Sequence, residues 1–123
     1  MTEATLAYQT RVADWMQACF GPEISADIPE RCLRFLEEAG ELCQALGMTE
    51  ETAHALVAYT WGRPAGEPDQ EVGGVVVTLA ALCEAAGLDM MGDGEKELAR
   101  IDNPEVIRRI REKHAAKPLK SRK

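Results

Sequence analysis

Aromatic side chains are scarce in this chain of 123 residues, at 5%, and β-branched stretches are few. Both kinds of residue are typical of strands, so their scarcity disfavours a sheet protein. Alanine and leucine are prominent instead, and 46% of the residues are hydrophobic, an ordinary value for a globular protein. The length allows one domain with its own core. We therefore predict an all-α fold, with a single domain over residues 1–116 and a basic, flexible tail over 117–123.

Metal-binding pairs of cysteine and histidine are also missing. The two histidines, His54 and His114, lie far in sequence from the four cysteines, which form no Cys-x-x-Cys pair, so no zinc site is expected. Each cysteine falls in a mostly apolar stretch, where a reduced thiol behaves as a small core residue. These are Cys19, Cys32, Cys43 and Cys83. Free thiols of this kind predict a reducing, cytoplasmic location.

Long apolar runs and an excess of positive charge are absent as well. The longest apolar run is far shorter than the roughly 18 residues of a membrane span, and no leader pattern begins the chain, so neither insertion nor export is expected. A net charge of −7 argues against nonspecific binding to nucleic acid, although a phosphate ligand bridged by a metal remains open. The basic tail is interpreted as solvated; its functional alternative is a flexible counter-charge near bound phosphates.

Helical spacing and capping residues divide the chain into segments. Asp27 followed by Glu30 resembles a capping box, Thr49 is a candidate N-cap, and Gly87 is a candidate C-cap. At Asn103-Pro104 the pattern indicates either a new helix or a kink. The predicted helices span residues 3–20, 28–46, 49 to about 59 or 61, 68–86, and a last region from 89 onward.

The segment 72–83 is the most apolar part of the chain. Three consecutive valines, 75–77, allow a buried strand, but the run continues through further alanines beyond the length of a typical strand and has no partner strand, so helix is preferred. A helix this apolar is expected to be covered by its own chain and by a second subunit. Gly73 and Gly74 weaken it, which close helix approach would offset. This favours a helical bundle of four to five helices that is completed by oligomerisation.

Three glutamates are the best indication of function. Glu38 and Glu41 lie three residues apart in the predicted helix 28–46, on neighbouring turns of one face, so their carboxylates can share one hard cation such as magnesium. Glu71 begins the apolar segment, where a desolvated carboxylate needs a cation or hydrogen bonds. The alternatives are a solvated acidic face for the pair and a first-turn acid for Glu71. The core face of helix 28–46 is predicted to be its apolar stripe, Cys32, Phe35, Leu36, Ala39, Leu42, Cys43 and Leu46.

The order of these acids resembles a known family. Glu37-Glu38-Ala39-Gly40-Glu41, followed after a short helix and loop by Glu71-Val72-Gly73-Gly74, is similar to the Glu-Glu-x-x-Glu and Glu-x-x-Asp patterns of the MazG-like all-α nucleoside triphosphate pyrophosphohydrolases. The resemblance covers most of residues 28–102. It departs at Gly74, where the family usually has aspartate.

The resemblance implies a set of site residues, assigned position by position. Glu38, Glu41 and Glu71 correspond to ligands of Mg²⁺, with Mn²⁺ as an alternative ion, and Glu37 to a possible general base beside Glu38. Cationic groups that could hold the outer phosphates are Arg34, Lys96 and Arg100, and aromatic groups that could stack on a base are Trp15, Tyr59 and Trp61. Each of these also has a plain structural interpretation as a surface or core residue.

The expected activity is Mg²⁺-dependent hydrolysis of a nucleoside or deoxynucleoside triphosphate to the monophosphate and pyrophosphate. The resemblance implies a homodimer or homotetramer, acting in nucleotide-pool cleaning or a phage-related role. The alternative is a catalytically impaired homologue that binds a nucleotide or a protein, because Gly74 replaces the expected carboxylate.

Overall fold

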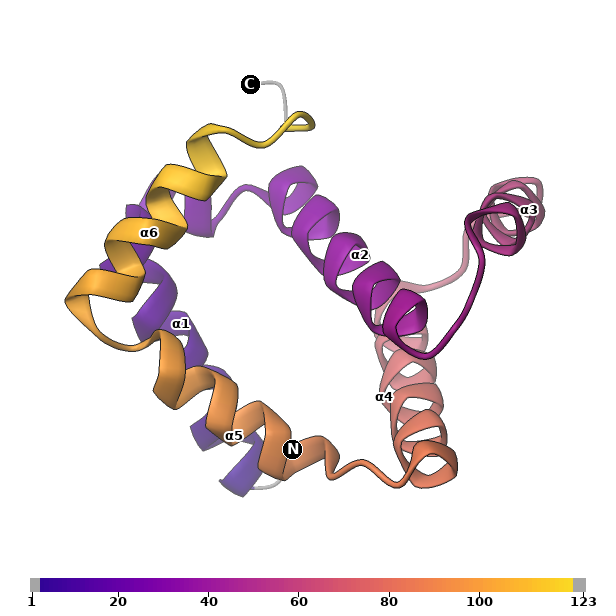
Figure 1. Ribbon diagram of the computed structural model, residues 1–123, viewed down its shortest axis with the longest axis horizontal. Helices are drawn as coiled ribbons and strands as arrows, with labels where there is room; N and C mark the ends of the chain where they lie inside the picture. Colours follow the sequence, from indigo (N-terminus) through magenta and orange to yellow (C-terminus); the bar gives the residue numbers. More distant parts are fainter. Residues whose placement is uncertain (1–2, 121–123) are drawn as a thin grey trace. The chain divides into compact units, whose positions relative to one another are not determined.

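The computed structural model describes residues 3–120, with side chains from residue 7 onward, and this part of the chain is all-α (Figure 1). It contains six helices and no strand. They are α1 (Glu3–Ser25), α2 (Ile28–Ala45), α3 (Glu50–Trp61), α4 (Pro68–Ala86), α5 (Met90–Ile101) and α6 (Pro104–Ala115). The predicted helical class is confirmed, and the apolar segment 72–83 is helical rather than a strand.

The helix ends follow the local chemistry of the sequence. Thr49 accepts a hydrogen bond from a backbone N–H in the first turn of α3, and Gly87 ends α4 with a left-handed φ of 70°. Asn103 caps α6 through its side chain, so the last region is two helices and the count is six rather than four to five. At Gly21, φ of 80° and ψ of 177° bend α1 where the sequence predicted its end, and a short helical turn continues to Ser25. Local capping therefore accounts for most of the boundaries.

The chain divides into two compact units. Unit 1 comprises Met1–Ala39 and Glu97–Lys123, and unit 2 comprises Gly40–Lys96. The prediction of one domain over 1–116 stays a prediction.

Unit 1 is organised around the packing of α6 on α1, which lie side by side (Figure 1). Cys19 of α1 is 2% exposed, and Arg111 of α6 donates to the backbone carbonyls of Ala18 and Cys19. The indole Nε1 of Trp15 donates to the carbonyl of Ile101 at the end of α5, 2.9 Å away. Side-chain hydrogen bonds to backbone carbonyls thus link α1 to α5 and α6.

The face of α2 that lies inward in unit 1 is polar, which corrects the prediction of an apolar core face. Glu30 is 2% exposed, whereas Phe35 and Leu36 of the predicted core stripe are 54% and 50% exposed and Cys32 is also exposed. A buried carboxylate is tolerated here because two cationic or hydrogen-bonding groups contact it. Of the predicted stripe, Ala39, Leu42 and Cys43 are half-buried, and the other four residues are exposed.

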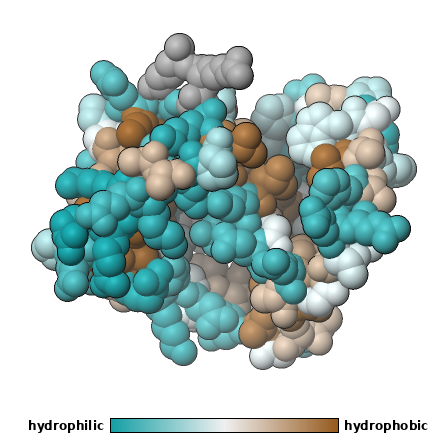
Figure 2. All heavy atoms as spheres, turned by 45° about the horizontal axis from the view of Figure 1, so that its top comes forward, coloured by the Kyte–Doolittle hydropathy of each residue, from teal (hydrophilic) through white to brown (hydrophobic). Residues whose placement is uncertain are grey.

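Unit 2 contains α3 and α4, and most of its side chains are exposed. Only Cys83 of α4 is buried there among the described residues, at 8% exposure, and Val72 and Val77 are 63% and 68% exposed. The expectation that α4 is covered by its own chain is therefore wrong; its coverage by a second subunit stays a prediction. Apolar side chains, in brown, are visible at the surface in Figure 2.

All four cysteines are free, but they do not share one environment. Cys19 and Cys83 are buried as predicted, Cys43 is half-buried, and Cys32 is exposed.

Within residues 3–120 no single helix is long and apolar enough to cross a membrane. Helices α4 and α5 have the required length and composition only when taken together as a pair, and this pair is bent by 100°.

Candidate functional site

Unit 1 contains a cavity of about 460 Å³ that receives side chains from four helices. Helical spacing explains why several residues of one helix face it: Arg31, Arg34 and Glu38 recur at i, i+3 and i+7 on α2. The same holds for Glu97, Arg100 and Ile101 on α5. The remaining lining residues are Trp15 and Phe20 of α1, Glu37 of α2, Ile110, Lys113 and His114 of α6, and Lys117 beyond it.

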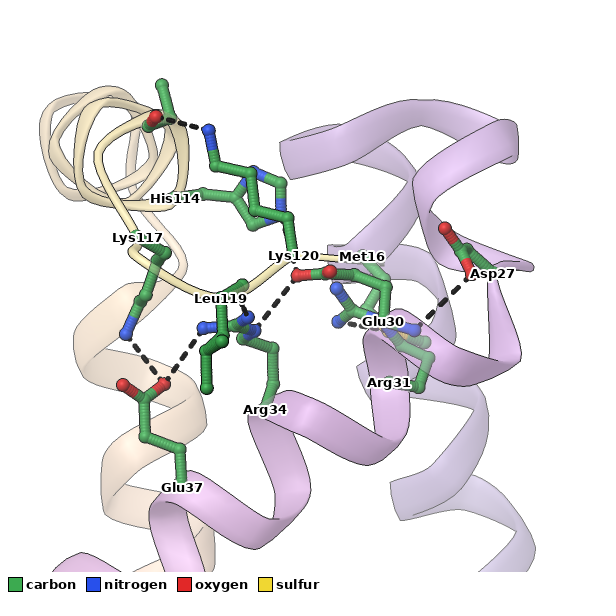
Figure 3. A network of polar contacts seen from close by, with 11 residues as sticks. Met16, Asp27, Glu30, Arg31, Arg34, Glu37, His114, Lys117, Leu119 and Lys120 are labelled. Atoms are coloured by element: carbon green, nitrogen blue, oxygen red, sulfur yellow. Dashed lines mark hydrogen bonds and ion pairs between the residues drawn. The ribbon is translucent and has the colours of Figure 1, made fainter. Parts of the chain in front are cut away.

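A buried group of charges lies beside this cavity. The Oε1 atom of Glu30 is 2.9 Å from Nε of Arg34 and 2.9 Å from Nε2 of His114 (Figure 3). The side chains of Arg34 and His114 are 17% and 18% exposed. The His114 ring also packs against Phe20, with ring centroids 5.2 Å apart. The contact with Glu30 holds the guanidinium of Arg34 in place at the wall of the cavity.

Glu37 is held between two cations. Its Oε1 atom accepts hydrogen bonds from Lys117 Nζ at 2.6 Å and from Arg34 Nη1 at 3.2 Å (Figure 3). The hydrogen bond from Lys117, supported by Arg34, lowers the pKa of Glu37 below its ordinary value. A carboxylate with a lowered pKa is a weaker base, which argues against Glu37 as the general base. Its contacts suit the positioning of the two cations.

The residues beyond α6 contact α2. Besides the Lys117 contact with Glu37, the carbonyl of Leu119 accepts a hydrogen bond from Arg34. The predicted tail, 117–123, therefore places its first part at the cavity wall, and residues 121–123 lie outside the described residues.

Arg100 of α5 is held by Glu97 of the same helix, and both residues line the cavity. Two hydrogen bonds, of 2.8 and 2.7 Å, run from the Arg100 guanidinium to the two oxygens of Glu97. The hydrogen bond from Arg100 lowers the pKa of Glu97, and Glu97, with a smaller contribution from Glu38, raises the pKa of Arg100. Glu38 of α2 and Arg100 of α5 are thus close enough to interact electrostatically.

The structure brings together four of the seven predicted site residues. Glu37, Glu38, Arg34 and Arg100 all line the cavity. The other three, Glu41, Glu71 and Lys96, belong to unit 2 and are not among its lining residues.

Two of the predicted metal ligands have the chemistry that magnesium requires. Glu38 and Glu41 are exposed carboxylates on successive turns of α2, which are oxygen ligands of the right type. However, no group of three or more His, Cys, Asp or Glu side chains within the described residues could hold a metal ion. The site for magnesium or manganese formed by Glu38, Glu41 and Glu71 therefore stays a prediction.

Glu71 has a simpler environment than the sequence suggested. It lies in the first turn of α4 and is exposed, so no desolvation penalty calls for a cation there. A Cβ atom added to Gly66 would be 3.4 Å from Cδ and Oε1 of Glu71, which places this carboxylate against the preceding loop. The first-turn interpretation, in which the acid meets the helix dipole, fits this environment.

Of the three aromatic candidates for stacking, only Trp15 lines the cavity; Tyr59 and Trp61 lie exposed on α3. The sequence interpretation did not select Arg31 or Lys113. The signal for Arg31 was its position three residues before Arg34, on the same side of the helix. Lys113 was visible only as part of the basic C-terminal region.

Glu30 and His114 were also not selected as a pair. They are 84 residues apart, and no local spacing connects them. Their contact depends on how α6 lies against α2 within unit 1.

Comparison of the chain with protein-family models, with curated proteins and with solved structures finds no match, and the likeness to the MazG-like enzymes therefore stays a prediction from the sequence motifs.

Proposed function

We propose that this protein is a magnesium-dependent nucleoside triphosphate pyrophosphohydrolase that converts a nucleoside or deoxynucleoside triphosphate and water to the monophosphate and pyrophosphate. One observation carries the proposal: Arg34, Glu37, Glu38 and Arg100, selected from the sequence as catalytic or phosphate-binding residues, line one cavity. Arg34, Glu37 and Glu38 share one side of α2 through the helical period, whereas Arg100 comes from α5, so its meeting with them is not a consequence of local spacing. The enzyme would act in the cytoplasm, where its four cysteines stay reduced.

The charge of the cavity supports a phosphate ligand. Five cationic side chains line it against three carboxylates, with His114 set aside, whereas the whole chain carries −7. A local positive excess in an acidic protein attracts a compact anion and disfavours a long nucleic acid. The aromatic wall of Trp15 and Phe20, in T-shaped contact with centroids 5.9 Å apart, supplies an apolar surface for a base.

The residues of the cavity would divide the work between binding and positioning. Arg34 and Arg100 would bind phosphate oxygens, and Lys117 would supply the counter-charge expected of the tail. Glu37 would orient Arg34 and Lys117 rather than accept a proton, because those cations lower its pKa. Glu38, an electrostatic neighbour of Arg100, would be the carboxylate of this cavity that takes part in the reaction. Magnesium, when bound, supplies neutralisation of phosphate charge and a more acidic water.

The direct test is release of pyrophosphate. Purified protein is incubated with each canonical ribonucleoside and deoxynucleoside triphosphate in the presence of magnesium, and pyrophosphate and monophosphate are measured. Glu38→Gln and Glu41→Gln are expected to abolish release from the preferred nucleotide, whereas Glu51→Gln, at an exposed position of α3, is the matched control. No release from any nucleotide would refute the enzymatic proposal.

A second candidate function is binding without turnover. Two observations favour it: Gly74 occupies the position of the expected aspartate, and the described residues form no three-carboxylate group. Gly74→Asp tests it, because a Cβ at this position meets no atom within 4 Å and the substitution is sterically open. Gly73→Asp, which is equally open and adds the same charge to the same helix, is its control. An impaired homologue would bind nucleotide without turnover, and a rise in turnover with Gly74→Asp alone would assign the impairment to the missing carboxylate.

We also propose that copies of the chain associate as a homodimer or homotetramer. In unit 2, Val72 and Val76 are exposed on one side of α4 at 63% and 52%, and Leu56 and Trp61 are exposed on α3. Exposed apolar side chains in this number are typical of a protein interaction surface. Val72→Lys with Val76→Lys is expected to reduce the mass measured by light scattering, whereas Gln9→Lys on α1 leaves it unchanged. A wild-type protein that is monomeric at all concentrations would contradict the proposal.

A further inference from the structure

Arg31 differs from the other arginines of the cavity because no hydrogen bond or ion pair joins it to an acidic side chain within the described residues. Its Nη1 donates to the sulfur of Met16 at 3.7 Å, and its guanidinium lies 5.2 Å from the centre of the Phe20 ring. Its Nε and Nη2 atoms are buried without a hydrogen-bond partner. A charged donor that has lost water and gained no acceptor is unfavourable, and an anion in the cavity offsets that loss.

The other two arginines already have acidic partners, so a phosphate would be an additional acceptor for them. Arg34 contacts Glu30 and Glu37, and Arg100 is bound by both oxygens of Glu97. Nε of Arg34 also has no partner with hydrogen-bond geometry, but it lies 2.9 Å from Glu30 and is compensated by that charge. The unmet demand for an acceptor in this cavity is therefore concentrated at Arg31.

A second cation with no hydrogen-bond or ion-pair partner among the described side chains faces the same cavity from another helix. Lys113 of α6 lines the cavity and makes no such contact through its ammonium group. Arg31 and Lys113 come from α2 and α6, which are distant in sequence, so the fold rather than local spacing places two cations without an acidic partner at the wall of one cavity. Two such charges fit an anion that carries more than one negative centre.

The length of the cavity along α2 points to the same kind of ligand. Arg31 and Glu38 both line it and are seven residues apart, which is about 10 Å along a helix axis. The cavity is therefore longer along α2 than a single phosphate, and it has room for linked phosphates held by cations of its wall.

We infer that Arg31 and Lys113 form an oxyanion site for linked phosphates, with Arg31 as its main donor. The inference names the ligand class of the cavity described above and rests in that respect on the proposed function. It adds a binding residue that the sequence motifs do not contain, and it requires neither magnesium nor catalysis. An oligophosphate without a nucleoside is therefore expected to bind.

The test uses inorganic tripolyphosphate, pyrophosphate and orthophosphate, titrated into the full chain without magnesium in a calorimeter. Trp61→Phe leaves Trp15, at the cavity wall, as the single tryptophan and allows its fluorescence to report binding at this site. Tripolyphosphate and pyrophosphate are expected to bind saturably and change the Trp15 emission. Orthophosphate is expected to bind at least about tenfold more weakly, since it engages fewer charged donors.

Arg31→Met removes the charge but keeps an apolar side chain for the contacts with Met16 and Phe20. It is expected to weaken tripolyphosphate binding by about ten- to a hundredfold, the loss of one charge-assisted contact. Arg63→Met is the matched control, because Arg63 also lies over an aromatic ring, 5.1 Å from the centre of Tyr59, but in unit 2. It is expected to leave the affinity unchanged.

Further variants keep the test decisive if Arg31→Met does not fold, as judged by thermal melting. Arg31→Lys retains the charge but not the planar donors and is expected to lose part of the affinity. Lys113→Met, at an exposed position, is expected to weaken binding by severalfold. Unchanged affinity in Arg31→Met, or in both Arg31→Lys and Lys113→Met, overturns the inference, as does a wild-type protein that binds neither oligophosphate.

The outcomes also separate this inference from the proposed enzyme. Oligophosphate binding that depends on Arg31, without pyrophosphate release from any nucleotide, would leave the oxyanion site standing and refute the enzyme. Nucleotide hydrolysis that is unaffected by Arg31→Met would leave the enzyme standing and refute the site.

Discussion

Replacing Glu30 by glutamine is expected to destabilise the protein more than any exposed charge substitution. Glu30 is 2% exposed, and its Oε1 atom is 2.9 Å from both Arg34 and His114. Removing one member of a buried ion pair costs about 3 to 5 kcal/mol, because the remaining charge stays buried without compensation. Two features of the site reduce this figure: Arg34 keeps a contact with Glu37 at 3.2 Å, and the glutamine oxygen can still accept one hydrogen bond. We expect a loss of about 2 to 3 kcal/mol in the free energy of unfolding.

The assay is urea unfolding followed by circular dichroism at pH 7, with the slope against urea used to check that both proteins unfold over the same surface. Glu112→Gln is the matched control: Glu112 contacts Arg108 at 3.0 Å, but its side chain is 62% exposed. Its loss is expected to be about 0.5 kcal/mol or less. The double variant Glu30→Gln with His114→Gln is expected to lose less than the sum of the two single losses, because the two residues contact each other.

A loss for Glu30→Gln no larger than that of Glu112→Gln would refute this reasoning. It would mean that Glu30 is hydrated in solution and that the inward polar face of α2 does not exist as described. The positions of Arg34 and His114 at the cavity wall would then lose their physical basis.

Three further outcomes follow from particular contacts. Lys117→Met is expected to lower the free energy of unfolding by less than about 1 kcal/mol at pH 7. Because Lys117 lowers the pKa of Glu37 in the folded protein, this stabilisation is present above the ordinary pKa of 4.5. Urea titrations should show the difference from wild type disappearing as the pH falls through the pKa of Glu37 in the folded protein. Under native conditions Cys32, which is exposed, is expected to react with an alkylating reagent. Burial raises the pKa of Cys19 and protects it until urea unfolds the chain. Mass spectrometry that finds Cys19 modified first would contradict its burial. Asn103→Ala is expected to cost about 1 kcal/mol of unfolding free energy by removing the cap of α6, whereas Asn103→Asp, which keeps an acceptor oxygen, should stay near wild type; equal losses would show that the cap does not contribute.

The helices of this protein were predictable from the sequence because their signals are local. The cap at Thr49, the left-handed Gly87 and the bend at Gly21 each act within about one turn of the residues that they affect. One ambiguity, at Asn103, concerned whether α5 and α6 are one helix or two. The structure has two, and the side chain of Asn103 accepts a hydrogen bond from the backbone N–H of Val106, three residues later.

Part of the cavity was also predictable, for the same reason. Arg34, Glu37 and Glu38 lie on one helix, and their shared side follows from the helical period. Arg100 was selected as a cation near the acidic motifs, and its position opposite Glu38 could not be read from spacing.

The tertiary structure alone decided which side of α2 faces inward. The sequence favoured the apolar stripe with Phe35 and Leu36, because burying apolar surface is the usual source of stability. In unit 1 the polar side is inward, since His114, 84 residues away, reaches Glu30 and satisfies its carboxylate. The sequence by itself determined the helices and the spacing of their charges, because both depend on neighbouring residues. Only the tertiary structure decided that Glu30 pairs with His114 and that Arg31 lacks an acidic partner, because both depend on contacts between distant segments.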